Sequence, residues 1–277
     1  MICGVPHAIV GTRKVYYELH GAHPGRPFVL IMGMGGSCRG WLPLQVPDFS
    51  REHRTLVYDH RGVGGSDDVG GPFSIADLAD DLAGLLDTLE VEDADVLGVF
   101  MGGMVAQELA LRHPNRVHRM VLAGTYARPD AKRRMILQQW RDLSLAGVSI
   151  EVMVRERLLW TLQEETLEQT DLIDQMLSFF TRDGAPLTEE VFRQQCEAAL
   201  GHDTADRLRD ISQPTLVICG RRDQLTPPSL HRELADEIPN AHLVTIRYGA
   251  HMVMAESAET FNRAVLKFLA EPDEPEL

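Results

Sequence analysis

The sequence predicts an α/β protein with a mostly parallel central sheet, helices on both faces and a helical insertion. Short, continuously apolar runs alternate with amphipathic stretches, the pattern of buried strands joined by crossover helices. A glycine-flanked turn at residues 98–102 joins one apolar run directly to a helical pattern. Residues 126–213 contain helical patterns and no strand candidate. With 277 residues, one α/β domain carrying an insertion fits better than two independent domains.

The first strands are predicted near the N-terminus. Apolar residues at 8–10 and 15–19 flank the turn at residues 11–13, which indicates a β-hairpin. The runs at residues 28–32 and 56–59 contain almost no charge and predict two strands buried on both faces.

The middle of the chain supplies a strand–helix–strand unit after an amphipathic helix. Ser74, with Asp77 three residues later, forms a capping-box pattern that opens a helix extending to residue 89. A strand at residues 94–99, a helix at 102–113 and a strand at 117–123 follow.

The remaining elements define the domain organisation. Helices are predicted at 135–145, 150–162, 170–180, 188–200 and 258–269, and strands at 215–219 and 243–246. We therefore expect a core domain from residues 1–125 and 214–270, with residues 126–213 inserted as a lid over the carboxyl ends of the strands. The acidic tail, residues 271–277, is expected to be disordered.

Charge and composition exclude several classes of function. The 41 acidic and 27 basic residues give a formal net charge of −14, which disfavours nucleic acid and anionic membrane as partners. No apolar run approaches the roughly 18 residues that span a bilayer, and the first seven residues do not resemble a secretory signal. The four cysteines are scattered, which argues against a zinc site or a disulfide framework, so we expect a reduced, cytoplasmic protein. No metal or organic cofactor is implied by the sequence.

The turn between the strand at 94–99 and the following helix is the motif most informative about chemistry. Gly98 and Gly102 lie where strand and helix backbones approach each other closely, as in the G-x-S-x-G nucleophile elbow. The central position, which the motif fills with serine, holds Phe100. A phenyl ring cannot be deprotonated or attack a carbonyl, so Phe100 cannot form an acyl-enzyme.

Four further stretches occur in the same order as in the α/β-hydrolase superfamily: Gly33-Met34-Gly35-Gly36, Asp59-His60-Arg61-Gly62, Cys219-Gly220-Arg221-Arg222-Asp223 and Gly249-Ala250-His251. Together with the elbow, they make the chain resemble the small esterase, enol-lactonase and C–C hydrolase branch of that superfamily. Its triad runs nucleophile, acid, histidine along the chain, so the resemblance implies Asp223 as the acid and His251 as the base. It also implies an oxyanion hole from the backbone N–H groups of Met34 and Met101.

Other nucleophiles and ligands are less consistent with the sequence. Cys38, Ser37 and Ser66 lack the strained, exposed position of an elbow residue, and a buried, inert thiol is the expected state of Cys38. The glycine-rich turn lacks the lysine and serine or threonine of a phosphate-binding loop. The aromatic candidates for lining an apolar pocket under the lid are Trp41, Trp140, Trp160, Phe179 and Phe180.

Three interpretations of Phe100 remain open. In the first, the chain is an enzyme in which His251, held by Asp223, acts as a general base on a small apolar carbonyl compound, without a covalent intermediate. The reaction is then of the hydrolysis, lyase or cyclase type. In the second, the pocket only binds a ligand or partner. In the third, Phe100 inactivates an ordinary serine esterase or lactonase. A homodimer is a possible assembly under each of the three interpretations. The intact Asp223 and His251 favour the first interpretation over the second.

Overall fold

The central sheet is confirmed by the computed structural model, which describes residues 6–68, 70–183 and 188–272. In this part of the chain eight strands form one sheet in the order β1-β2-β4-β3-β5-β6-β7-β8. The strands are β1 His7–Val10, β2 Arg13–His20, β3 Phe28–Ile31, β4 Thr55–Tyr58, β5 Ala94–Val99, β6 Val117–Ala123, β7 Thr215–Gly220 and β8 Ala241–Ile246. Strand β2 pairs antiparallel with β1 and β4, and all other neighbours are parallel. The predicted α/β fold class is therefore correct.

The apolar runs form the centre of the sheet because both of its faces are covered. Every residue of β3, β4, β5 and β7 is buried. Side chains alternate between two cores, as the pleat of a strand requires: in β3, Val29 and Ile31 face one core, and Phe28 and Leu30 face the other.

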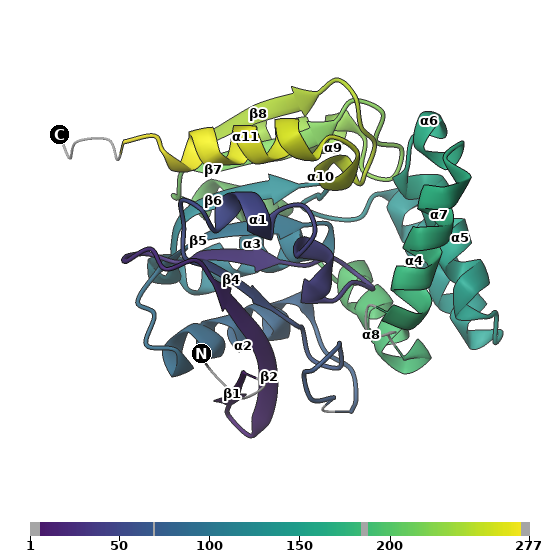
Figure 1. The fold of residues 1–277 in the computed structure, drawn as a ribbon, viewed down its shortest axis with the longest axis horizontal. Helices are drawn as coiled ribbons and strands as arrows, with labels where there is room; N and C mark the ends of the chain where they lie inside the picture. The colour runs from purple at the N-terminus through teal and green to yellow at the C-terminus, as the bar shows by residue number, and fades with distance from the viewer. Residues whose placement is uncertain (1–5, 69, 184–187, 273–277) are drawn as a thin grey trace.

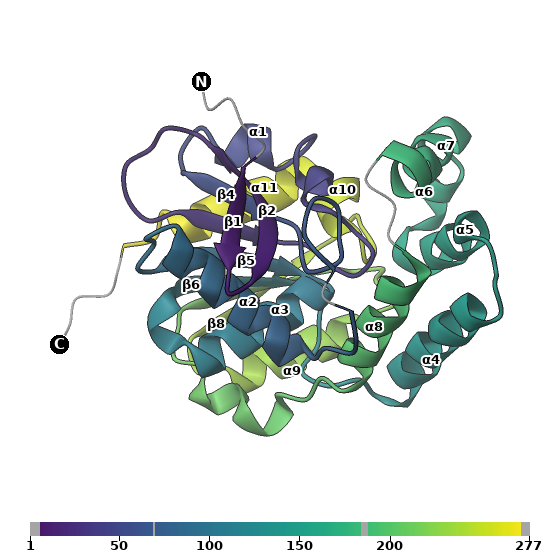
Figure 2. The ribbon, with the colours of Figure 1, turned by 90° about the horizontal axis from the view of Figure 1, so that it is seen from below.

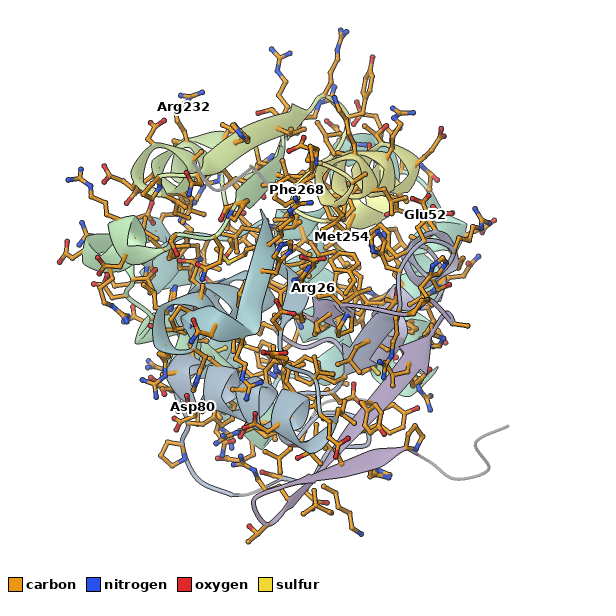
Figure 3. The ribbon with its side chains drawn as sticks, turned by 90° about the vertical axis from the view of Figure 1, so that its left-hand side faces the viewer. Arg26, Glu52, Asp80, Arg232, Met254 and Phe268 are labelled. Carbon is orange, nitrogen blue, oxygen red and sulfur yellow. The ribbon has the colours of Figure 1, made fainter. Side chains whose placement is uncertain are left out.

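Helices cover each face of the sheet (Figure 1). They are α1 Val46–Phe49, α2 Ile75–Thr88, α3 Met101–Arg112, α9 Pro228–Glu237, α10 Val253–Glu256 and α11 Ala258–Leu269. Helices α2, α3 and α9 contribute to one core, and α1, α10 and α11 to the other. In the side-chain view, Met254 and Phe268 belong to this second core, whereas Glu52 and Arg232 lie on the surface (Figure 3).

A helical segment, residues 126–213, separates β6 from β7. Its helices are α4 Ala131–Leu145, α5 Ile150–Thr161, α6 Glu164–Leu167, α7 Thr170–Ser178 and α8 Glu189–Leu200, with a π-helical turn η3 at Phe179–Asp183. Figures 1 and 2 both show these helices gathered on one side of the sheet. The described part of the segment contains no strand, as predicted.

Short 3₁₀ turns complete the described part of the chain: η1 Cys38–Trp41, η2 Pro114–Arg116 and η4 Ala205–Asp210. Within the same residues no helix has the length and apolar character needed to cross a membrane.

Several boundaries differ from the predictions for local reasons. Helix α4 begins at Ala131 rather than 135 because Asp130 caps it, its carboxylate accepting from the backbone N–H of Arg133. The helix predicted at 170–180 divides into α7 and η3. The capping box of Ser74 and Asp77 is confirmed at the start of α2. Of the predicted acidic tail, residues 273–277 lie outside the described residues.

Candidate functional site

The turn after β5 has the strained geometry of a nucleophile elbow. Phe100 has φ 57° and ψ −121°, a conformation that costs a bulky residue on the order of 1–3 kcal/mol. Its N–H donates to the carbonyl of Ala123 (3.0 Å), and its own carbonyl accepts from Gly103 (3.1 Å). Gly98 is needed here because a Cβ would lie 2.2 Å from the carbonyl oxygen of Gly102.

His251 and Asp223 are brought together from two loops. Asp223 follows β7, His251 follows β8, and both side chains are almost completely buried. The Nδ1–H of His251 donates to Asp223 Oδ2 at 2.9 Å. This bond places the proton on Nδ1 and leaves Nε2 as the basic nitrogen. Nε2 makes no hydrogen bond to any described residue, and His251 lines a cavity.

Thr226 completes this arrangement. Its hydroxyl donates to Asp223 Oδ2 (2.6 Å), lies 2.9 Å from His251 Nδ1, and its N–H donates to Asp223 Oδ1 (2.6 Å). Burial alone would raise the pKa of Asp223, but the charge of His251 and the hydrogen bonds from His251 and Thr226 outweigh it, and the pKa is lowered. Asp223 is therefore a carboxylate at neutral pH. Sequence analysis missed Thr226, although a threonine three residues after an aspartate is a known local hydrogen-bonding pattern.

The ring of Phe100 lies directly on the imidazole. The two ring centroids are 4.1 Å apart and the planes are inclined by 18°. Glycine at 33 and 124 provides the space, because a Cβ at Gly33 would lie 2.4 Å from the phenyl ring and one at Gly124 2.9 Å from it. Stacking covers the face of the imidazole, whereas Nε2 donates or accepts in the plane of that ring. Stacking on the face does not by itself block the in-plane approach to Nε2.

Met34 and Met101 lie at the same cavity. Met101 is the first residue of α3, and Met34 belongs to the glycine-rich loop after β3. Neither backbone N–H donates to another described residue. Two side chains of the helical segment hold the peptide between Met34 and Gly35: Arg157 donates to the Met34 carbonyl (2.8 Å), and Gln195 accepts from the Gly35 N–H (2.9 Å).

The cavity itself has a volume of about 150 Å³, comparable with an engineered cavity that binds benzene. Its lining is mostly apolar and includes Ile136, Leu137, Val154 and Leu158 from α4 and α5. Of the aromatic candidates, the lining ones are Trp41, Trp140, Phe179 and Phe180. Trp160 is not among the lining residues and instead donates its indole N–H to Glu156 (2.9 Å).

The alternative nucleophiles have structural partners. Cys38 is fully buried, and burial raises the pKa of its thiol. Ser66 donates to the backbone carbonyl of Asp59 (2.7 Å) and accepts from the N–H of Tyr16 (2.9 Å). The Asp59 carboxylate accepts from the N–H groups of Cys38 and Gly65, so this motif joins two loops of the core.

No group of three or more His, Cys, Asp or Glu side chains in the described ranges could hold a metal ion. Cys38, Cys196 and Cys219 are free thiols, and Cys3 lies outside the described residues.

Residues 26–258 match the family of the alpha/beta hydrolase fold, and the chain belongs to this family. It is 35% identical to a protein of Azorhizobium caulinodans named "Putative carbamate hydrolase RutD" over 98% of this chain and 100% of the relative. The crystal structure of an enol-lactonase from Burkholderia xenovorans LB400 is 30% identical, with a TM-score of 0.87 over 96% and 100% of the two chains. A hydrolase from Pseudomonas aeruginosa PA01 has 29% identity and a TM-score of 0.88 over 98% and 100%. The predicted superfamily is thus correct, and its relatives support a hydrolase.

Three buried histidines lie outside the His251–Asp223 pair. His60 donates from Nε2 to the carbonyl of Met32 (2.9 Å), and His231 accepts at Nε2 from the N–H of Thr125 (3.3 Å). Burial lowers the pKa of His60 and His231 to about 4 and that of His202 to about 3. All three are neutral in the folded protein at pH 6.

We expect stability to fall as the pH is lowered from about 6.5 to about 4. In this window the unfolded chain binds protons at His60, His202 and His231 that the folded chain does not bind, so acid favours unfolding. If the unfolded chain binds three more protons than the folded chain, the free energy of unfolding changes by about 4 kcal/mol per pH unit near pH 5. Urea unfolding at several pH values measures how the free energy of unfolding depends on pH. His231→Asn should lower that slope by the contribution of about one proton. A stability that does not change between pH 6.5 and 4.5 would contradict this prediction.

Proposed function

We propose that this protein hydrolyses a small, largely apolar ester, lactone or thioester by general-base catalysis, without a covalent intermediate. The observation that carries the proposal is His251, whose Nδ1 is held by Asp223 and whose Nε2 has no described partner at the cavity. An imidazole held in this tautomer can accept a proton from a water molecule. Phe100 supplies no hydroxyl and stacks on the ring that would activate it.

In the proposed reaction, water is the nucleophile. Nε2 of His251 takes a proton as the water oxygen bonds to the substrate carbonyl carbon, and the carbonyl oxygen becomes an oxyanion. The N–H groups of Met34 and Met101 stabilise this oxyanion, and such donors contribute roughly 3–4 kcal/mol each in working sites. The protonated His251 then donates to the leaving oxygen or sulfur as its bond to carbon breaks. Asp223 stabilises the imidazolium in between.

The helical segment 126–213 has a defined part in this proposal. We assign it as a lid, with residues 1–125 and 214–270 as the core domain. Its helices α4 and α5 supply much of the apolar lining, and Arg157 and Gln195 bind the loop that carries Met34. A lid that excludes water from all but the reacting position would strengthen the electrostatic interactions in the cavity.

The wild-type protein should hydrolyse at least one member of a panel of activated esters, lactones and thioesters without reacting with a fluorophosphonate. General-base catalysis contributes roughly 10²–10⁴-fold, so turnover should be slow but well above the rate in buffer. Steady-state assays and mass spectrometry of the probe-treated protein measure the two results. Turnover accompanied by stoichiometric labelling would mean a different nucleophile, and no turnover across the panel would favour a ligand-binding protein or an inactivated serine hydrolase.

A further inference from the structure

Arg157 places a positive charge at the apolar cavity. It lies on α5 and is one of the lining residues. Its guanidinium lies against Gly35, where an added Cβ would be 2.5 Å from Nη1. The Cζ atom is 5.7 Å from the ring centroid of Trp140 and 5.2 Å from that of Phe192, close enough for cation–π interactions.

Most N–H donors of this guanidinium have no described protein partner. Of its five N–H donors, one makes a described hydrogen bond, from Nη2 to the Met34 carbonyl. Nε is buried and has no hydrogen-bond partner. No described aspartate or glutamate forms an ion pair with Arg157. The side chain is partly buried, and its neighbour Glu156 attracts it without an ion pair because Glu156 accepts from the indole N–H groups of Trp140 and Trp160. A partly buried cation without a carboxylate in contact is unfavourable, and arginine keeps its charge at neutral pH.

The described lining of the cavity supplies no negative charge of its own. No aspartate or glutamate is among its described lining residues. The other lining arginine, Arg133, is already paired with Asp130 and donates to the Leu225 carbonyl (2.8 Å). The cavity is therefore cationic although the whole chain carries a formal charge of −14.

We propose that Arg157 binds a carboxylate of the ligand, so that the cavity selects small organic monoanions. The planar fork of a guanidinium matches the two oxygens of a carboxylate. One unpaired cation in a cavity of about 150 Å³ balances one negative charge, whereas a phosphate dianion would leave charge uncompensated. Resting on the proposed function, this inference makes the substrate an ester, lactone or thioester that carries a separate carboxylate. Arg157 would then be a specificity-determining residue.

The test compares two ligands of similar size and different charge, phenylacetate and phenylacetamide, by isothermal titration calorimetry. Wild-type protein should bind phenylacetate at least about tenfold more tightly, as expected for charge-assisted hydrogen bonds. Arg157→Gln should bind the two with similar affinity, and Arg157→Lys should retain part of the preference. Arg155→Gln is the matched control, because Arg155 lies on the same helix, is exposed and pairs with Glu151. It should keep the wild-type preference, and thermal melting checks that each variant is folded.

Three results would overturn the inference: equal affinity for the two ligands in wild type, no binding of either, or a preference that survives in folded Arg157→Gln. The first would mean that Arg157 only positions the peptide between Met34 and Gly35. Because phenylacetate has no ester bond, its binding does not depend on hydrolysis. If the protein prefers phenylacetate but hydrolyses nothing, the carboxylate inference stands and the proposed function is wrong. If it hydrolyses a substrate without preferring phenylacetate, the proposed function stands and the carboxylate inference is wrong.

Discussion

His251→Ala is expected to lower kcat/KM for any ester, lactone or thioester that the wild type hydrolyses by about 100-fold or more. The variant loses the only base that the proposed reaction uses, and general-base catalysis contributes roughly 10²–10⁴-fold. Binding and the backbone donors of Met34 and Met101 would remain, so a residual rate above that in buffer is expected. Steady-state kinetics across the pH range of the wild-type activity measures the loss.

Phe100→Ala and His242→Ala are the matched comparisons. Phe100→Ala removes the ring stacked on His251 but not the base, so activity should stay within about tenfold of wild type. His242 is exposed at the start of β8, whereas His251 follows the other end of that strand, so its replacement should have no effect. If Phe100→Ala abolishes activity while His251→Ala retains it, the general-base mechanism is wrong.

The fold class could be predicted from the sequence because the central strands are short apolar runs, as expected where helices cover both faces of a sheet. The run at 28–32 ends in a glycine-rich turn and the run at 94–99 leads into a helical pattern, which together predict strands of a buried sheet, and both are confirmed as β3 and β5. Helix α9 was missed although Pro227-Pro228 is a helix-start signal, because few residues of Pro228–Glu237 are apolar: Leu230, Leu234 and Ala235. The antiparallel pairing of β2 with β4 also depends on tertiary packing rather than on a local motif.

Only part of the candidate site could be predicted from the chain. Asp223 and His251 were predicted from the order of the motifs, and in the structure Nδ1 of His251 lies 2.9 Å from Oδ2 of Asp223. Arg157 and Gln195 belong to no recognisable motif. Their hydrogen bonds reach a loop more than 100 residues away in the sequence, so local patterns do not predict them. The stacking of Phe100 on His251 was not predicted either. Such contacts are set by how the helical segment and the two loops pack, which periodicity does not encode.

Phe100→Ser is expected to make the protein reactive toward a fluorophosphonate, with a labelling rate roughly 100-fold or more above wild type. A serine at the strained elbow position would place its hydroxyl in the space the phenyl ring now fills beside His251. The base, its carboxylate partner and the free N–H groups of Met34 and Met101 are already present. Intact-mass measurement of the probe adduct, together with hydrolysis of an activated ester, detects the gain.

Two variants make this result specific for residue 100. Phe100→Ala opens the same space without a hydroxyl and should stay unlabelled, and Phe100→Ser combined with His251→Ala should lose the gained reactivity because no base remains. Labelling of the serine variant alongside unlabelled turnover by the wild type would mean that one scaffold supports both covalent and water-based chemistry. Labelling of the variant with a wild type inactive on the whole panel would instead identify Phe100 as the residue that blocks an ordinary serine hydrolase. A serine variant that neither labels nor gains turnover would show that the cavity around Phe100, Gly33 and Gly124 no longer accommodates a serine nucleophile.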